Sequence, residues 1–230
     1  MIQARHGYLN LLVNNAGVAM NLLPALPTPQ TGDIRAFRDA MLGAGHRDDF
    51  ATTFDVNVTS AFYSTLLFLE LLDAGNKRGN MPGVTSQVIS VASVGAFRRD
   101  DKVFTASYTF SKAAAVHMGK LLANYLKDWQ IRSNVICPGV FPSGLSRQLL
   151  CSHARLNDVT FFKEMMTDKI LTEQLVKTGI PLGRIGNIDD MAGLTLYLAS
   201  RVRILTTSAK HIQADAESRL VHTSTARYIS

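Results

Sequence analysis

The chain has 230 residues, of which 47% are hydrophobic and 18% are charged, and its formal net charge is +6. This composition is typical of one globular domain with a sizeable core, and it excludes a fully disordered chain. Basic residues are scattered and do not alternate with aromatic residues, so we expect no nucleic-acid partner. The most apolar stretch, residues 61–72, is too short to cross a bilayer and contains Glu70, so we expect no membrane span.

The two cysteines, Cys137 and Cys151, are too few for a disulfide framework, and no His or Cys cluster has zinc-site spacing. The first six residues lead directly into a strand pattern, without the apolar core of a signal peptide. We therefore expect a cytoplasmic or organelle-matrix protein with reduced cysteines and no metal.

Strand patterns alternate with helix patterns along the chain. Apolar runs predict a strand buried on both faces at residues 9–13, a second buried strand at 86–92 and a third strand at 132–137. Apolar residues at helical spacing predict helices at 33–42, from Asp48 to about 73, and at 108–129, 158–177 and 189–200. Residues 75–83 form a polar, glycine-rich stretch and are expected to be a loop. This order of elements predicts an α/β fold with a parallel sheet and right-handed crossovers.

Tyr108 and Lys112 stand four residues apart in the run Ser107-Tyr-Thr-Phe-Ser-Lys112. On a helix this spacing places both side chains on one face, as it also does for ordinary surface pairs. A free tyrosine has a pKa near 10 and is a poor acid–base catalyst at neutral pH. A neighbouring ammonium favours the phenolate and lowers that pKa, so the pair suggests a proton-transfer centre.

Other short motifs accompany this pair in a characteristic order. They are Asn14-Asn-Ala-Gly17, Asn57, Ser93, Pro138-Gly139, Pro181-Leu-Gly-Arg184, Asp190-Met-Ala-Gly and Tyr197-Leu-Ala-Ser200. In this order and spacing, the chain resembles the short-chain dehydrogenase/reductase family from about Tyr8 to Ser200. The resemblance implies a Rossmann-like parallel sheet with flanking helices. It also implies an NAD(P)(H)-dependent oxidoreductase that interconverts a ketone, such as a 3-oxoacyl or other hydrophobic keto compound, and a secondary alcohol.

The resemblance gives four of these residues a catalytic role. Tyr108 is implied to be the acid–base residue, and Lys112 to tune it and to reach the nicotinamide ribose. Ser93, preferred to Ser90 by its place after the strand, is implied to hydrogen-bond the substrate oxygen. Asn57 is implied to distort its helix and to bind a water that relays protons through the lysine. The alternatives are a plain loop serine at position 93 and an exposed helix asparagine at position 57.

The cofactor site implied by the resemblance has three parts: the stretch after the first strand, the catalytic helix, and the loop after the third strand. A tight turn alone would explain the glycine of the first part, and a serine replaces the more usual threonine in the last part. The residues are Asn15, Ala16, Gly17, Tyr108, Lys112, Pro138, Gly139, Phe141 and Ser143.

Residues 145–180 occupy the place of the family's substrate lid. Phe161, Phe162, Met165 and Met166 suggest an apolar lining, and at helical spacing they are equally typical of a core. The resemblance thus implies a partial NAD(P)-binding domain over residues 1–200, including the catalytic centre and the lid. Residues 201–230 are expected to be an atypical, loose tail, with a strand-like pattern at 202–207.

The beginning of the chain departs from the family pattern. About seven residues precede the first strand, and no Gly-x-x-x-Gly-x-Gly loop opens a helix. Such a loop binds the pyrophosphate through backbone N–H groups, so weaker cofactor binding is expected. The residue that separates NAD from NADP also has no counterpart, and NADP is only slightly favoured. The departure predicts a truncated or wrongly spliced reductase that lacks the first strands of the doubly wound fold, with an apolar edge at 9–13.

Two functions therefore stay open from the sequence. The first is a catalytic oxidoreductase without a metal, acting on a small carbonyl or alcohol substrate as a homodimer or tetramer through the helices around Asn57 and Tyr108. The second is a non-catalytic fragment that binds the cofactor poorly and acts by pairing with a full-length relative. A basic nucleic-acid binder is a distant third.

Overall fold

The structure is a computed structural model that describes residues 2–20, 26–99, 105–145 and 183–200 and the backbone of 211–214. Its strands are β1 (Leu11–Asn14), β2 (Gln87–Val91), β3 (Arg132–Pro138) and β4 (His211–Ala214). They form one sheet in the order β1-β2-β3-β4, and every neighbouring pair is parallel. The predicted α/β fold with a parallel sheet is confirmed.

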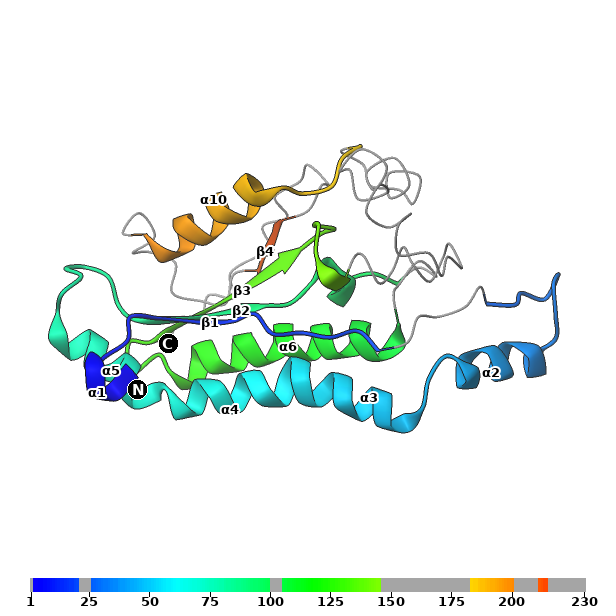
Figure 1. Ribbon diagram of the computed structural model, residues 1–230, viewed down its shortest axis with the longest axis horizontal. Coiled ribbons are helices and arrows are strands. Elements are labelled where there is room, and N and C mark those ends of the chain that lie inside the picture. Colours follow the sequence, from blue (N-terminus) through cyan, green and yellow to red (C-terminus); the bar gives the residue numbers. More distant parts are fainter. Residues whose placement is uncertain (1, 21–25, 100–104, 146–182, 201–210, 215–230) are drawn as a thin grey trace, which may run out of the picture.

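Helices cover both faces of this sheet (Figure 1). The helical elements are α1 (Ile2–Arg5), α2 (Ile34–Gly43), α3 (Arg47–Phe54), the π-helical turn η1 (Asp55–Thr59), α4 (Ser60–Leu67), α5 (Leu69–Arg78), the 3₁₀ turn η2 (Val94–Ala96), α6 (Ala106–Tyr125) and α10 (Ile188–Ala199). Figure 1 shows α3, α4 and α6 along one face and α10 along the other.

Successive residues of β2 pack into the core on opposite faces of the sheet, because side chains alternate in direction along a strand. Val88 packs with Leu72 and Leu122 on the side of α6, and the next residue, Ile89, packs with Leu198 of α10. β2 is therefore buried on both faces, as predicted. β1 is not: Val13 is 43% exposed, because β1 is an edge strand with β2 as its only described neighbour. Leu12 and Leu11 still pack against the cores on opposite faces, so the expectation of burial on both faces holds only in part for β1.

The helix expected to run from Asp48 to about residue 73 is broken in the structure. It begins at Arg47, with His46 as the capping residue, and the His46 N–H donates to the Asp49 carboxylate over 2.9 Å. Asp48 therefore lies in the first turn and does not cap the helix. The helix then widens at η1 and breaks again at Phe68, whose φ and ψ of −100° and 2° are not helical.

Residues 75–83, expected to be a loop, begin inside a helix, because α5 continues to Arg78 and ends at Gly79 with a φ of 63°. Gly75 lies within α5, where a β-carbon would overlap the backbone oxygen of Leu9. The helix can therefore lie against the residues before β1 only if position 75 has no side chain. The helices expected at 33–42, 108–129 and 189–200 are confirmed as α2, α6 and α10, with small shifts of their ends.

The expected loose tail includes a strand, β4, which pairs with β3 from Val135↔His211 to Pro138↔Ala214. The expectation is wrong for these four residues, because His-Ile-Gln-Ala is too short to show a strand pattern. The strand-like stretch at 202–207, the helix at 158–177 and the lid beyond residue 145 lie outside the described residues. Across the described part of the chain, no helix combines the length and apolarity that a membrane crossing requires.

Candidate active site

The sequence-predicted site residues gather at one edge of the sheet. β1, β2 and β3 are parallel, so their carboxyl ends lie at the same edge, which is where ligands bind in open α/β sheets. Gly17 follows β1, Ser93 follows β2, and Gly139 follows β3. The amino end of α6, which carries Tyr108, contacts η2 just after β2.

The Ser93 side chain lies close enough to the Tyr108 phenol to interact with it and to lower the pKa of the phenol. Thr105 caps α6 and its Oγ1 accepts from the Tyr108 N–H over 2.9 Å, which fixes the first turn that carries the phenol. Gly95 lies between the two side chains: an added β-carbon would be 3.3 Å from Ser93 Oγ and 3.6 Å from Tyr108 Cε1. Ser93 also caps η2, where its Oγ accepts from the Gly95 N–H over 3.0 Å, so it is not the plain loop serine of the alternative. Its contact with a substrate oxygen stays a prediction.

The pKa of Tyr108 is raised above the ordinary tyrosine value, mainly by burial, since only 6% of the residue is exposed. The hydrogen bond with Ser93 acts in the opposite direction, and the nearby Cys137 thiol raises the pKa further. The pKa of the phenol is thus raised and not lowered as expected, because burial outweighs the polar contacts. The Lys112 ammonium is 5.7 Å from the ring centroid, and burial lowers its own pKa to about 8.

Lys112 is buried and its Nζ donates a hydrogen bond to the backbone oxygen of Val91 over 2.9 Å, at the end of β2. The alternative of a surface Tyr–Lys pair is therefore excluded, because both side chains are buried. This bond holds the ammonium at the edge of the sheet where Ser93 and Tyr108 meet.

Asn57 is also buried and connects three parts of the site. Its Nδ2 donates to the backbone oxygen of Val18 and to Ser111 Oγ, each over 2.9 Å, and its Oδ1 accepts from the Val18 N–H over 2.8 Å. It lies in the π-helical turn η1, which agrees with the implied helix distortion. The alternative of an exposed helix asparagine is excluded.

Gly17 lies against these polar groups, and its lack of a side chain has a steric reason. An added β-carbon would be 3.1 Å from Lys112 Nζ and 3.3 Å from Asn57 Oδ1. Gly17 is not among the glycines with positive φ, so close approach explains it better than a tight turn does. Asn15 and Ala16, which precede it in the chain, are exposed.

The third part of the expected cofactor site is the loop after β3. Pro138 ends β3, Gly139 follows it, Phe141 is half-buried and Ser143 is exposed. The Ala92 N–H donates to the backbone oxygen of Ile136 over 2.7 Å, which ties the end of β3 to the residue after β2. Burial raises the pKa of the neighbouring Cys137 thiol to about 12, and the Ser93 backbone acts in the opposite direction. The structure thus brings the three parts of the expected site to one edge.

The donors at this edge suit the hydroxyl and amide groups of a ribose and a nicotinamide, because they combine an ammonium with exposed backbone beside glycines. A glycine-rich turn for the pyrophosphate does not occur within residues 1–230. The fit is therefore to the nicotinamide end of the cofactor. Across the described residues, no three His, Cys, Asp or Glu side chains gather to hold a metal ion.

Sequence reasoning missed three residues of this site. Thr105 caps the catalytic turn, Ser111 links Asn57 to the Tyr108 backbone by donating to its oxygen over 2.8 Å, and Cys137 contacts Ser93. The helix-start signal of a threonine before an apolar helix could have identified Thr105. No local pattern identifies the other two, because their partners are distant in sequence.

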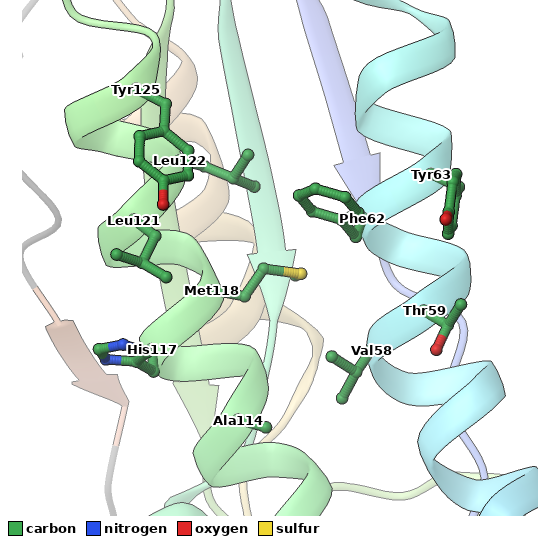
Figure 2. A pocket seen from close by; sticks show the side chains of 10 residues that line it. All are labelled: Val58, Thr59, Phe62, Tyr63, Ala114, His117, Met118, Leu121, Leu122 and Tyr125. Carbon is green, nitrogen blue, oxygen red and sulfur yellow. The ribbon is translucent and has the colours of Figure 1, made fainter.

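A hollow of about 380 Å³ lies apart from this site, between the η1–α4 segment and the second half of α6. Figure 2 shows Val58 and Phe62 pointing toward Met118 across it. Its lining is apolar apart from a few hydroxyl and imidazole groups: Val58, Thr59, Phe62, Tyr63, Ala114, His117, Met118, Leu121, Leu122 and Tyr125. A smaller hollow of about 80 Å³ lies beside the start of α6 and is lined by residues that include His46 and Ser107.

Known proteins resemble the whole described architecture. The short-chain dehydrogenase/reductase PhomF of Diaporthe leptostromiformis is 40% identical over 195 residues, which are 85% of this chain and 60% of that protein. The 3-oxoacyl-[acyl-carrier-protein] reductase FabG of Chlamydia pneumoniae is 25% identical over 199 residues, covering 86% of this chain and 61% of that protein. The solved RhlG/NADP active-site complex of Pseudomonas aeruginosa has a TM-score of 0.68 and 26% identity, covering 94% of this chain and 68% of that one.

The chain spans about 60% of the length of PhomF, so the relatives extend beyond the aligned part. The family model for short chain dehydrogenases matches residues 1–151, and this range includes all three parts of the expected cofactor site. The chain therefore belongs to the short-chain dehydrogenase family.

Proposed function

We propose that this chain provides the catalytic centre of an NAD(P)(H)-dependent oxidoreductase that interconverts a ketone and a secondary alcohol. The observation that carries the proposal is the buried hydroxyl pair of Ser93 and Tyr108, with Lys112 one helical turn away. Reduction of a carbonyl requires a proton donor at the oxygen that becomes an alkoxide and a second group that holds this oxygen. The pair supplies both.

In the reduction, the Ser93 hydroxyl donates a hydrogen bond to the carbonyl oxygen and Tyr108 transfers its phenolic proton to that oxygen. A nicotinamide cofactor, when bound, supplies the hydride. The raised pKa of Tyr108 keeps the phenol protonated at neutral pH, which is the form that reduction needs. Lys112, with a pKa of about 8, gains or loses a proton near neutral pH and is suited to return a proton to the tyrosine.

Asn57 has a supporting part in this proposal. Its amide is engaged by Val18 and Ser111, so it holds the Gly17 stretch against Lys112 and fixes the catalytic turn of α6. The water relay through Lys112 that the resemblance implies stays a prediction for this residue. The cofactor-binding residues are proposed as expected from the sequence, with NADP slightly favoured over NAD.

A hydrophobic keto compound, such as a 3-oxoacyl thioester, is the proposed substrate. Support comes from the relative named 3-oxoacyl-[acyl-carrier-protein] reductase and from the apolar residues expected in the lid, which lie outside the described part of the chain. Support for NADP comes from the solved relative described as an NADP complex.

A second copy of this chain is the proposed partner at the surface formed by α4 and the second half of α6. Exposed apolar side chains flank the hollow there, including Tyr63, Leu67 and Tyr125 at 58%, 81% and 61% exposure. Large exposed apolar patches mark interaction sites, and a two-fold interface buries the same patch on both copies. The residues that line the hollow include no Asp, Glu, Lys or Arg, which suits burial in such a dimer.

The test is a titration with NADPH, followed by an assay of NADPH consumption with a 3-oxoacyl thioester. We expect saturable binding and turnover that falls by a factor of about 10² to 10⁴ in Tyr108→Phe. The matched control is Tyr125→Phe, a tyrosine on the same helix that is 61% exposed, which should retain full turnover. Absence of binding at millimolar NADPH would favour the alternative of a non-catalytic fragment that pairs with a full-length relative.

A further inference from the structure

The loop after β3 is tied to the turn that precedes α10. The chain leaves β3 at Pro138 and enters α10 at Ile188, and between these points the Gly186 N–H donates to the backbone oxygen of Val140 over 2.9 Å. The two ends of the long connection from residue 141 to 185 therefore meet, whatever path lies between them.

The Phe141 ring occupies the space where a side chain of Gly186 would be. A β-carbon added to Gly186 would overlap Cε1 and Cζ of this ring and would lie 2.8 Å from its Cδ1. Gly186 is not among the described glycines with positive φ, so its backbone conformation does not demand glycine. The ring is the reason that position 186 cannot carry a side chain.

The turn beneath the ring is held by several polar contacts of its own. Asn187 and Asp190 cap α10 reciprocally, each accepting from the other's backbone N–H over 2.9 Å. The Arg184 guanidinium pairs with both oxygens of Asp190 at 2.6 and 3.0 Å, and it holds the pKa of that carboxyl down to about 2. Its Nη1 also donates to the backbone oxygen of Ile185 over 3.1 Å. Residues 184–187 are thus a preformed support.

We propose that Gly186 is a positioning residue for the cofactor loop, residues 138–143. Its missing side chain lets Phe141 pack on the turn before α10, and this packing, with the Val140 bond, fixes where the loop leaves the sheet edge. The inference rests on the proposed function, which places the nicotinamide end of the cofactor beside this loop. Displacing the ring therefore weakens both the backbone bond and cofactor binding.

The test compares Gly186→Ala, Phe141→Ala and the double variant by amide hydrogen exchange at residue 186 and by NADPH titration. Gly193→Ala is the matched control, because this glycine also lies in the α10 region and an added β-carbon meets nothing within 4 Å. We expect Gly186→Ala to lower the protection factor at residue 186 at least tenfold and to raise the NADPH dissociation constant at least fivefold. Gly193→Ala should change neither quantity.

The double variant shows whether the Phe141 ring is the cause of the changes in protection factor and dissociation constant. If the Phe141 ring is the obstacle, adding Gly186→Ala to Phe141→Ala should change both quantities less than twofold. Effects that simply multiply in the double variant would overturn the proposal, as would an unchanged dissociation constant in Gly186→Ala. If Gly186→Ala alone does not fold, folding of the double variant supports the proposal and its failure overturns it.

The exchange measurement needs no cofactor. A wild-type chain that does not bind NADPH therefore contradicts the proposed function, whereas the contact between Phe141 and Gly186 is still decided by the protection factors. If that contact is upheld without cofactor binding, the positioning role for a cofactor is rejected together with the function.

Discussion

The two halves of α6 bury different kinds of side chain. Its first two turns bury Ser107, Tyr108, Ser111 and Lys112, and these polar groups are held by hydrogen bonds to Thr105, Ser93, Asn57 and Val91. Its last turns bury Met118 and Leu122 and leave Leu121 and Tyr125 partly exposed beside the apolar hollow (Figure 2).

The difference shows how one helix serves two purposes. Buried polar groups cost free energy unless each has a partner, so the first half is stable only in one arrangement. Apolar packing is less directional and tolerates a partner surface. The first half is thus suited to chemistry at fixed positions, and the second half to packing and association. Changes in the first half should therefore cost more than changes in the second.

The largest expected effect on stability is that of Asn57→Ala. The variant loses three hydrogen bonds and leaves Ser111 and the Val18 backbone without these partners, which should cost about 3 kcal/mol of unfolding free energy in urea. Asn80→Ala is the control, because Asn80 is exposed and its bonds are 3.4 Å long. A cost for Asn57→Ala as small as that of the control contradicts the network.

The next effect concerns pH. Burial lowers the pKa of Lys112 from 10.5 to about 8, so between these values the folded protein binds fewer protons than the unfolded chain. Stability contributed by this group is therefore low below pH 8 and rises as the pH increases. Between pH 8 and pH 10, the wild type should gain on the order of 2 kcal/mol relative to Lys112→Met in urea unfolding.

Both proteins retain Tyr108 and Cys137, and burial raises the pKa of both groups, that of Cys137 to about 12, so the comparison between pH 8 and pH 10 reports mainly on Lys112. Lys127→Met, which removes an exposed lysine beyond the end of α6, is the matched control. Equal pH dependence in wild type and Lys112→Met would show that Lys112 is not held in a buried, neutral-favouring site.

A smaller effect is expected at the start of the helix. Thr105→Ala removes the oxygen that accepts from the Tyr108 N–H and should cost about 1 kcal/mol in thermal or urea unfolding. Thr105→Ser keeps the hydroxyl and should retain most of the stability. The capping account fails if the serine variant is destabilised as much as the alanine variant.

Substitutions in the second half of α6 are expected to have the smallest effect on the free energy of unfolding and the largest effect on dimer formation. Leu121→Lys places a charge beside the hollow and should change the monomer's stability by less than about 0.5 kcal/mol. In sedimentation it should nevertheless convert a dimer into a monomer. Leu196→Lys, on a residue of α10 that is 67% exposed, should leave the dimer intact. Dimers of equal strength in both variants place the interface elsewhere.

The sequence predicted the parallel sheet because apolar runs such as that of β2 are buried on both faces. It did not predict β4, whose four residues are a strand only because β3 offers a parallel edge. It also missed the break at Phe68, because the apolar spacing continues through it. Periodicity reports which residues are buried, and it does not report where the backbone changes its hydrogen bonding.

Only those residues of the candidate site that belong to recognisable sequence motifs could be predicted. Ser93, Tyr108, Lys112 and Asn57 come together as the resemblance implies. The direction of the Tyr108 pKa was wrong, because sequence spacing shows the neighbouring lysine and does not show the depth of burial. Sequence distance likewise hides the contact of Phe141 with Gly186.

The measurement that tests the central claim most directly is the titration of Tyr108 in wild type and in Ser93→Ala, followed by NMR of tyrosine ring carbons with Tyr108→Phe as the assignment control. The account predicts that Tyr108 titrates above the ordinary value of about 10 in the wild type, and still higher in Ser93→Ala, because the Ser93 hydrogen bond holds the pKa down. A Tyr108 that titrates at the ordinary value, or that does not respond to Ser93→Ala, would contradict the shared hydroxyl site.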